Sequence, residues 1–121
     1  MRLTLQITAL AAALAGCGGS SKPNTPGPAQ VTLAAAGVAP ASVNVGSGGQ
    51  VHFVNNDAAA HQIAGSANCT ELNSPSLATG KDFTATLGTG PKTCTFNDGL
   101  NPTASAFSGT INVAAPNTPG Y

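Results

Sequence analysis

Three cysteines and two histidines are the residues of this sequence that could bind a metal or change oxidation state: Cys17, Cys69, Cys94, His52 and His61. Thiolate sulfur and imidazole nitrogen are ligands that copper and zinc favour in proteins. Two cysteines can instead form a disulfide, and the reactive form of the side chain, the thiolate, is then lost. The chemistry open to this chain therefore depends on whether Cys94 meets a metal or another sulfur.

The remaining reactive side chains form no catalytic motif. Four acidic residues are scattered along the chain: Asp57, Glu71, Asp82 and Asp98. Their spacing indicates no acid–base pair, and Asp57 and Asp98 stand in segments typical of turns. No serine lies in a Gly-x-Ser-x-Gly motif, and no glycine run resembles a phosphate-binding loop. The sequence therefore predicts that the protein is not an enzyme.

The composition predicts one small domain. The chain has 121 residues, a formal net charge of zero and 7% charged residues, with fifteen glycines, nine prolines and no tryptophan. Nucleic-acid binding is not expected, because it needs clustered basic residues that this chain lacks. Many threonine, serine, asparagine and glycine residues between short valine-rich runs are typical of a secreted β protein.

The N-terminal stretch "MRLTLQITALAAALAGC" has the pattern of an export signal. It has a positive charge at Arg2, an apolar run over residues 7–14 and small residues before Cys17. The apolar run is shorter than the roughly 20 residues that a membrane-spanning helix needs. The ending "LAGC" resembles the bacterial lipobox, in which the cysteine is lipidated on its sulfur and becomes the first mature residue. An ordinary signal peptide followed by an unmodified cysteine is the alternative.

The lipobox resemblance implies a location for the protein. Residues 1–16 would be a lipoprotein signal peptide, and the acyl chains on Cys17 would hold the protein at a membrane, each buried methylene contributing about 0.8 kcal/mol. Gly18 follows the cysteine, and the resemblance then favours the outer membrane, facing the periplasm or the cell surface. The expected partner is therefore a membrane, contacted through lipid, and a protein partner in the envelope is left open.

Composition also divides the rest of the chain. Residues 17–29 contain glycine, serine and proline without apolar periodicity, so we expect a lipidated cysteine followed by a flexible linker. Residues 30–115 form the expected folded domain, and 116–121 a disordered tail.

Within the expected domain, short runs of alternating apolar and polar residues recur between turn signals, at 31–35, 40–45, 50–56, 82–87, 92–96 and 108–113. A period of two residues indicates β-strands. In the run at 50–56, Val51 and Phe53 should face one side, and His52 and Val54 the other. No run after the signal peptide has helical periodicity. The pattern predicts an all-β, antiparallel sandwich with Greek-key connections.

Two stretches resemble the cupredoxin family. "GGQVHFVNNDAAAHQI" is similar to its alternating strand, asparagine pair and following histidine, and "CTFNDGLNPTASAFSGTINV" is similar to its ligand loop and final strand. The resemblance implies a cupredoxin-like fold, in which blue copper needs two imidazoles, a thiolate and a weak axial ligand. When the cupredoxin pattern is aligned with this sequence, His61 and Cys94 match two of the ligand positions. Asn97 stands where the second histidine is expected, and Phe107 at the axial position.

The number of cysteines favours a disulfide. If lipid modifies Cys17, Cys69 and Cys94 remain as an even pair in an oxidising compartment. The segments "NCTELN" and "TCTFNDGLNP" are also similar to those of bacterial cupredoxin-like proteins that have histidines where Asn97 and Gly99 stand here. We therefore expect a Cys69–Cys94 disulfide, and Cys94 is a copper ligand only if that bond is absent.

Two functional hypotheses remain. The first is a lipid-tethered cupredoxin-like module that has lost type 1 copper, needs no cofactor and has a structural or binding role. The alternative is a copper-binding electron-transfer protein of the cupredoxin family. His61 is a candidate ligand for a weakly bound metal ion, and a histidine that is only hydrogen-bonded at the end of the sandwich is the other interpretation.

Overall fold

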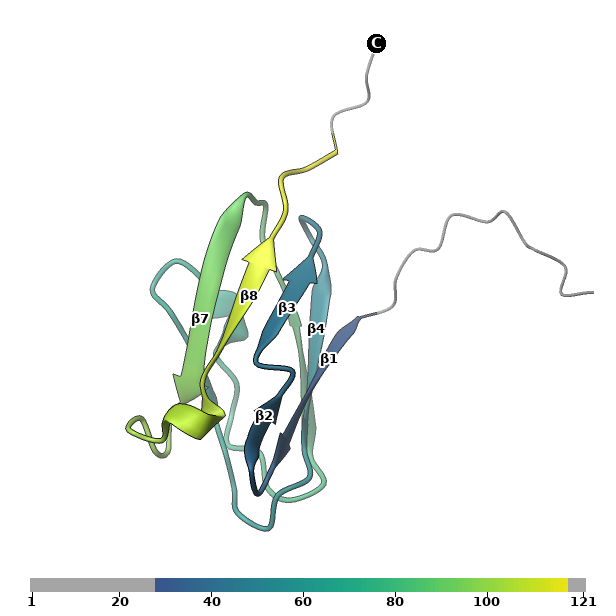
Figure 1. The fold of residues 1–121 in the computed structure, drawn as a ribbon. Helices are drawn as coiled ribbons and strands as arrows, with labels where there is room; N and C mark the ends of the chain where they lie inside the picture. Colours follow the sequence, from purple (N-terminus) through teal and green to yellow (C-terminus); the bar gives the residue numbers. More distant parts are fainter. Residues whose placement is uncertain (1–27, 118–121) are drawn as a thin grey trace, which may run out of the picture.

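A computed structural model describes residues 28–117. The predictions for the signal peptide, for Cys17, for most of the linker and for the end of the tail fall outside the described residues. Eight strands and two short 3-10 helices follow in order (Figure 1): β1 (Ala29–Ala34), β2 (Gly37–Ala39), β3 (Ser42–Val45), β4 (Gln50–Asn55), β5 (Ile63–Gly65), η1 (Thr70–Leu72), β6 (Asp82–Thr86), β7 (Lys92–Asp98), η2 (Ser105–Phe107) and β8 (Gly109–Val113).

The strands form two four-stranded sheets, in the orders β2-β1-β4-β6 and β3-β8-β7-β5. The predicted all-β sandwich is confirmed. The sheets are mixed, however, and not wholly antiparallel as predicted, because β1 pairs with β4 and β3 pairs with β8 in parallel, while the other pairs are antiparallel. The chain passes from β2 in one sheet to β3 in the other before β4 returns beside β1, which places β1 and β4 in the same direction.

The core lies between the sheets, where alternate side chains of each strand meet. Val51 and Phe53 of β4 are fully buried, as their alternation predicts, and Phe53 contacts Phe96 of β7 edge to face, with ring centroids 5.3 Å apart. His52 lies on the outer face, where its Nε2 is 2.7 Å from Asp82 Oδ2 on β6. His52 and His61 therefore belong to different environments, and His52 takes no part in the site described below.

The structure contains the Cys69–Cys94 disulfide that the cysteine count predicts. Both residues are fully buried, with their Cα atoms 5.7 Å apart and 25 positions separating them in the sequence. Cys69 directly precedes η1, and Cys94 lies in the middle of β7. The bond therefore fastens the loop between β5 and β6 to the centre of the sandwich.

Helix is confined to the short turns η1 and η2 in the described part of the chain. Within residues 28–117, no helix has the length and apolar character needed to cross a membrane.

Candidate functional site: a histidine held between two carboxylates

His61 lies in the loop after β4 and is hydrogen-bonded through both ring nitrogens. Its Nδ1 is 2.6 Å from Asp98 Oδ2, and its Nε2 is 2.7 Å from Asp57 Oδ2. A neutral imidazole has one N–H group, so it can donate to only one of these carboxylates. The geometry therefore fits an imidazolium that donates to both. We call Asp57, His61 and Asp98 the imidazolium cluster.

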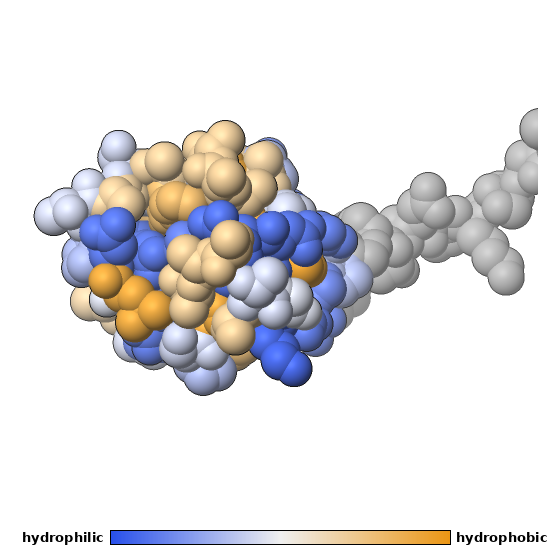
Figure 2. All heavy atoms as spheres, turned by 90° about the horizontal axis from the view of Figure 1, so that it is seen from below, coloured by the Kyte–Doolittle hydropathy of each residue, from blue (hydrophilic) through white to orange (hydrophobic). Residues whose placement is uncertain are grey.

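The backbone of His61 fixes the ring in place. The His61 N–H donates to the Leu77 carbonyl over 3.0 Å, and the Leu77 N–H donates back over 2.6 Å. The residue is 4% exposed. Figure 2 views the end of the molecule where β7 stops, and its surface there mixes apolar and polar residues. Leu100, in the loop that follows β7, is the only large hydrophobic residue exposed in the described part of the chain.

Asp57 is positioned by Asn55, the buried last residue of β4. The Asn55 side-chain amide donates to the carbonyls of Ala59 and Leu77, over 2.9 and 2.8 Å, and its oxygen accepts the N–H of Asp57 over 2.9 Å. An asparagine that bonds to the backbone two residues on forms a turn of its own. The turn brings the Asp57 carboxylate back toward the ring of His61, four residues later.

Asp98 is positioned by the register of β5 and β7. It is the last residue of β7, pairs with Ile63 of β5 and is 1% exposed. Its Oδ1 accepts the N–H groups of Gln62 and Leu100, each over 3.0 Å, which leaves Oδ2 for His61. All three interactions stabilise the ionised carboxylate, because each donates a hydrogen to it.

Phe107 covers one face of the imidazole. Its ring centroid lies 4.2 Å from that of His61, with 24° between the ring planes. The face of an aromatic ring attracts a cation at such distances, so this stack also favours the charged form of His61. The resemblance placed Phe107 at the axial position, and in the structure its ring, which has no donor atom, packs on the face of His61.

The pKa values follow from these contacts. Burial lowers the pKa of His61, but hydrogen bonds and negative charge from Asp98 and Asp57 outweigh burial and raise it above the ordinary 6.5. Burial raises the pKa of Asp98, but its bonds with His61, Gln62 and Leu100 outweigh burial and lower it below 3.8. The hydrogen bond from His61 lowers the pKa of Asp57. Between pH 3.8 and 6.5, His61 is therefore protonated and both carboxylates are ionised, so the cluster carries one net negative charge.

The structure does not place Cys94 and Asn97 beside His61, although the family resemblance assigned both to copper-ligand positions. Cys94 faces the core four residues before Asp98 on β7, which at about 3.3 Å per residue is about 13 Å along the strand. Asn97 is next to Asp98, so its side chain points to the opposite, outer face of the sheet. The β7 side chain beside His61 is therefore Asp98, and neither Cys94 nor Asn97 reaches the histidine.

The donors around His61 do not fit type 1 copper. That centre requires a thiolate and two imidazoles, whereas this cluster offers one imidazole and two carboxylates. The carboxylates contact different ring nitrogens, so they lie at separate edges of the ring and do not converge with it on one ion. A metal at His61 would have to displace at least one of them.

A second group of potential ligands is already satisfied by other bonds. Within residues 28–117, Cys69, Glu71 and Cys94 have ligand atoms within 4.8 Å of one another. The two sulfurs form the disulfide, and Glu71 Oε1 lies 2.6 Å from Lys92 Nζ, a contact that lowers the pKa of Glu71. These residues therefore form a disulfide and a neighbouring ion pair, and not a set of free metal ligands.

Asp57 and Asp98 were not predicted as partners of His61, because their sequence context indicates turns. Asp57 does accept the N–H of Ala58, and Asp98 that of Leu100, so both also shape turns. One signal was available for Asp98: it shares the alternation of Cys94 and Phe96, which places all three on the inner face of β7. An acidic residue that faces a core requires a partner.

Comparisons with known proteins support the fold. No protein-family model and no curated protein matches the chain. Among solved structures, a purple cupredoxin from Nitrosopumilus maritimus matches with a TM-score of 0.60 and 21% identity, covering 71% of this chain and 99% of its own. The Cu(I) form of an amicyanin mutant matches with a TM-score of 0.63 and 18% identity, covering 74% of this chain and 84% of its own. An oxidised amicyanin mutant matches with a TM-score of 0.62 and 18% identity, covering 71% of this chain and 81% of its own.

These similarities define the class of fold: the chain has a cupredoxin-like β-sandwich. Identities of this size establish the fold alone. The function has to be inferred from this chain's own residues.

Proposed function

We propose that this protein is a lipid-anchored envelope protein whose cupredoxin-like domain has lost type 1 copper and has a structural or binding role. One observation carries the proposal: both nitrogens of His61 are bound to carboxylates, at 2.6 and 2.7 Å. The sulfur that the sequence suggested as a copper ligand is in a disulfide. In this proposal the imidazolium cluster is a cross-link between loops, the chain needs no cofactor, and its role is not catalytic.

The cluster joins segments that are distant in sequence. Asp57 and His61 belong to the loop after β4, and Asp98 ends β7; Phe107, which stacks on His61, ends η2. A cation between two carboxylates can hold such segments together, as a bound metal would, provided that each charge is paired and hydrogen-bonded. The structural role is therefore to close the end of the sandwich without a metal.

The proposed anchor is at the other end of the domain. Ala29, where β1 begins, pairs with Val51 near the start of β4, whereas His61 follows the end of β4. Acyl chains on Cys17 would then hold the domain by the end opposite to the cluster. We place the protein at the outer membrane, facing the periplasm or the cell surface, from the lipobox resemblance and Gly18.

The alternative is copper-dependent electron transfer, which is supported by the similarity of the fold to solved cupredoxin structures. A Cu(II) titration separates the two, because a copper–thiolate centre has an intense visible absorption band. We expect no such band in protein purified from cells or after Cu(II) is added. A strong band, or copper bound stoichiometrically in protein as isolated, would establish the alternative.

Two variants make this experiment sharper. Cys69→Ala frees the Cys94 thiol but leaves it about 13 Å along β7 from Asp98, so no His61–thiolate copper site should form. Asp98→Cys instead puts a sulfur beside His61 Nδ1, and Cu(II) should then produce a thiolate-to-copper band. If Cys69→Ala alone gives the band, the position assigned to Cys94 is wrong.

A further inference from the structure

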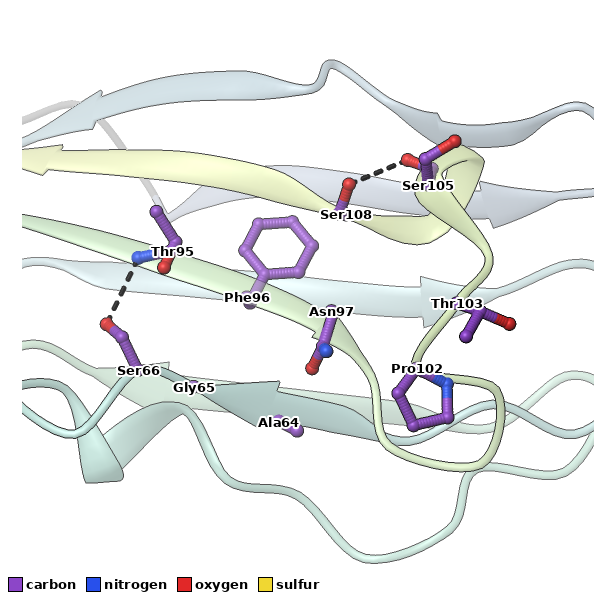
Figure 3. Close-up of a pocket in the computed structure, with 10 residues that line it drawn as sticks. All are labelled: Ala64, Gly65, Ser66, Thr95, Phe96, Asn97, Pro102, Thr103, Ser105 and Ser108. Atoms are coloured by element: carbon purple, nitrogen blue, oxygen red, sulfur yellow. Dashed lines mark hydrogen bonds between the residues drawn. The ribbon is translucent and has the colours of Figure 1, made fainter.

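A cavity of about 500 Å³ lies on the outer face of the β3-β8-β7-β5 sheet. Strands β5 and β7 supply its base, and the segment between β7 and β8 forms a wall (Figure 3). Thr95 and Asn97 of β7 line it, because they alternate with inward-facing residues of that strand. The cavity is therefore separated from the imidazolium cluster by the sheet itself, although both use the end of β7.

Hydroxyl and amide groups dominate the polar lining, which comprises Ser66, Thr95, Asn97, Thr103, Ser105 and Ser108. Two of the hydroxyls are already engaged: Ser66 Oγ accepts the Thr95 N–H over 3.2 Å, and Ser108 Oγ donates to the Ser105 carbonyl over 2.6 Å. Figure 3 shows these two bonds as dashed lines. The side chains of Thr95, Asn97, Thr103 and Ser105 make no side-chain hydrogen bond to any residue between 28 and 117. They are available to a ligand.

The lining carries no charge. Within the described residues, the acidic side chains and both lysines lie elsewhere: Asp57, Glu71, Asp82, Asp98, Lys81 and Lys92. An anionic ligand would find no basic partner in the lining, and a cationic ligand no acidic one, so neither would gain the charge-assisted hydrogen bonds that favour a charged ligand. The ligand that fits is neutral.

An extended peptide has no free strand edge here. The Gly65 N–H donates to Asn73 Oδ1 over 2.8 Å, and the Ile63 N–H donates to Ser74 Oγ over 2.9 Å. The Ser74 N–H completes the pairing by donating to the Ile63 carbonyl over 2.9 Å. Since residues 73 and 74 already occupy the outer edge of β5, a peptide cannot bind by adding a strand beside it.

We propose that this cavity binds a neutral oligosaccharide. Sugar hydroxyls both donate and accept hydrogen bonds, which matches the threonine, serine and asparagine groups of the lining. Pro102 and Ala64 offer apolar surface to the C–H faces of a sugar ring. The volume lies within the range of about 300–1,000 Å³ usual for ligand sites. The inference names a ligand class for the binding role proposed above, and it rests on that role.

The test is an NMR titration of the full chain purified in a detergent without a sugar headgroup, since a maltoside would itself occupy the site. The probes are maltotriose and chitotriose, with a galacturonic acid trimer as the anionic counterpart. We expect one neutral trisaccharide, at millimolar concentration, to shift the backbone amides of Thr95 and Thr103 and the side-chain amide of Asn97. The anionic trimer should cause no such shifts.

Asn97→Ala should raise the Kd about fivefold, the loss expected for one hydrogen bond of about 1 kcal/mol. The matched control is Asn112→Ala, which removes the same side chain from β8 outside the cavity and should leave the Kd unchanged. Thr103→Val provides a second variant on the wall if Asn97→Ala does not fold.

The inference is wrong if neither neutral trisaccharide causes shifts, if the shifts map elsewhere, or if the variants of the lining bind like the parent. Copper binding and membrane anchoring are measured separately, so such a result leaves the absence of type 1 copper and the anchor standing.

Discussion

Replacing His61 with glutamine removes the cation of the imidazolium cluster and leaves Asp98 buried without a charge partner. The side chains of His61 and Asp98 are 5% and 1% exposed, so solvent screens their interaction little. Removing one member of a buried ion pair costs about 3–5 kcal/mol. We therefore expect His61→Gln to lower the free energy of unfolding by about 3–5 kcal/mol near pH 5.

The pH dependence gives this prediction a second test. The pKa of His61 is raised above 6.5, so its contribution to stability is complete below 6.5 and is lost as the pH rises through its pKa in the folded protein. The pKa of Asp98 is lowered below 3.8, so its contribution is present above 3.8 and is lost as the pH falls through its folded value. The difference between parent and His61→Gln should be largest between pH 3.8 and 6.5 and smaller in alkaline solution.

Urea unfolding followed by circular dichroism measures this difference, since the chain has no tryptophan for fluorescence. His52→Gln is the matched control. Its ion pair with Asp82 is exposed, with 31% and 62% of the two side chains accessible, so the change should cost under about 1 kcal/mol. A loss below about 1 kcal/mol for His61→Gln near pH 5, or an equal loss in alkaline solution, would show that His61 is not a buried cation paired with Asp98.

Three other changes test the remaining parts of the structure. Cys69→Ala should lower the free energy of unfolding by about 3.5 kcal/mol, from the loop entropy of a 25-residue separation; unchanged urea unfolding would argue against the disulfide. Gly37→Ala should destabilise, because φ is +125° and an added Cβ would collide with the Ala106 carbonyl, whereas Gly46→Ala has open space and should be nearly neutral in the same assay. Cys17→Ser should move the protein from the membrane to the soluble fraction, and a parent protein found soluble with an unmodified Cys17 would contradict the anchor.

Much of the fold is predictable because its longer strands are exposed on one face and buried on the other. The alternation at 50–56 identifies β4 and the inward direction of Phe53. The Cys69–Cys94 pairing is predictable because only two cysteines remain once Cys17 is assigned to lipid, and that assignment depends on the lipobox resemblance. The three-residue strands β2 and β5 are too short to show alternation, and their pairing with longer strands defines them.

The site was harder to predict, because its contacts join residues distant in sequence. Asp98 is 37 positions from His61, and only the register between β5 and β7 brings them together. Sequence similarity placed Cys94 at the ligand position, whereas the strand pairing puts it beside Ile111, in the middle of β7. A shift of four residues keeps the same face of a strand, so alternation alone could not distinguish Cys94 from Asp98.

The imidazolium cluster requires that His61 is a cation that donates to both Asp57 and Asp98. A nitrogen-15 NMR spectrum of the imidazole rings, recorded on the mature protein near pH 6, observes this directly. The structure predicts that both ring nitrogens of His61 are protonated, and that they remain so at a higher pH than in an exposed histidine, whose ordinary pKa is 6.5. A neutral ring with one unprotonated nitrogen at that pH would contradict the claim.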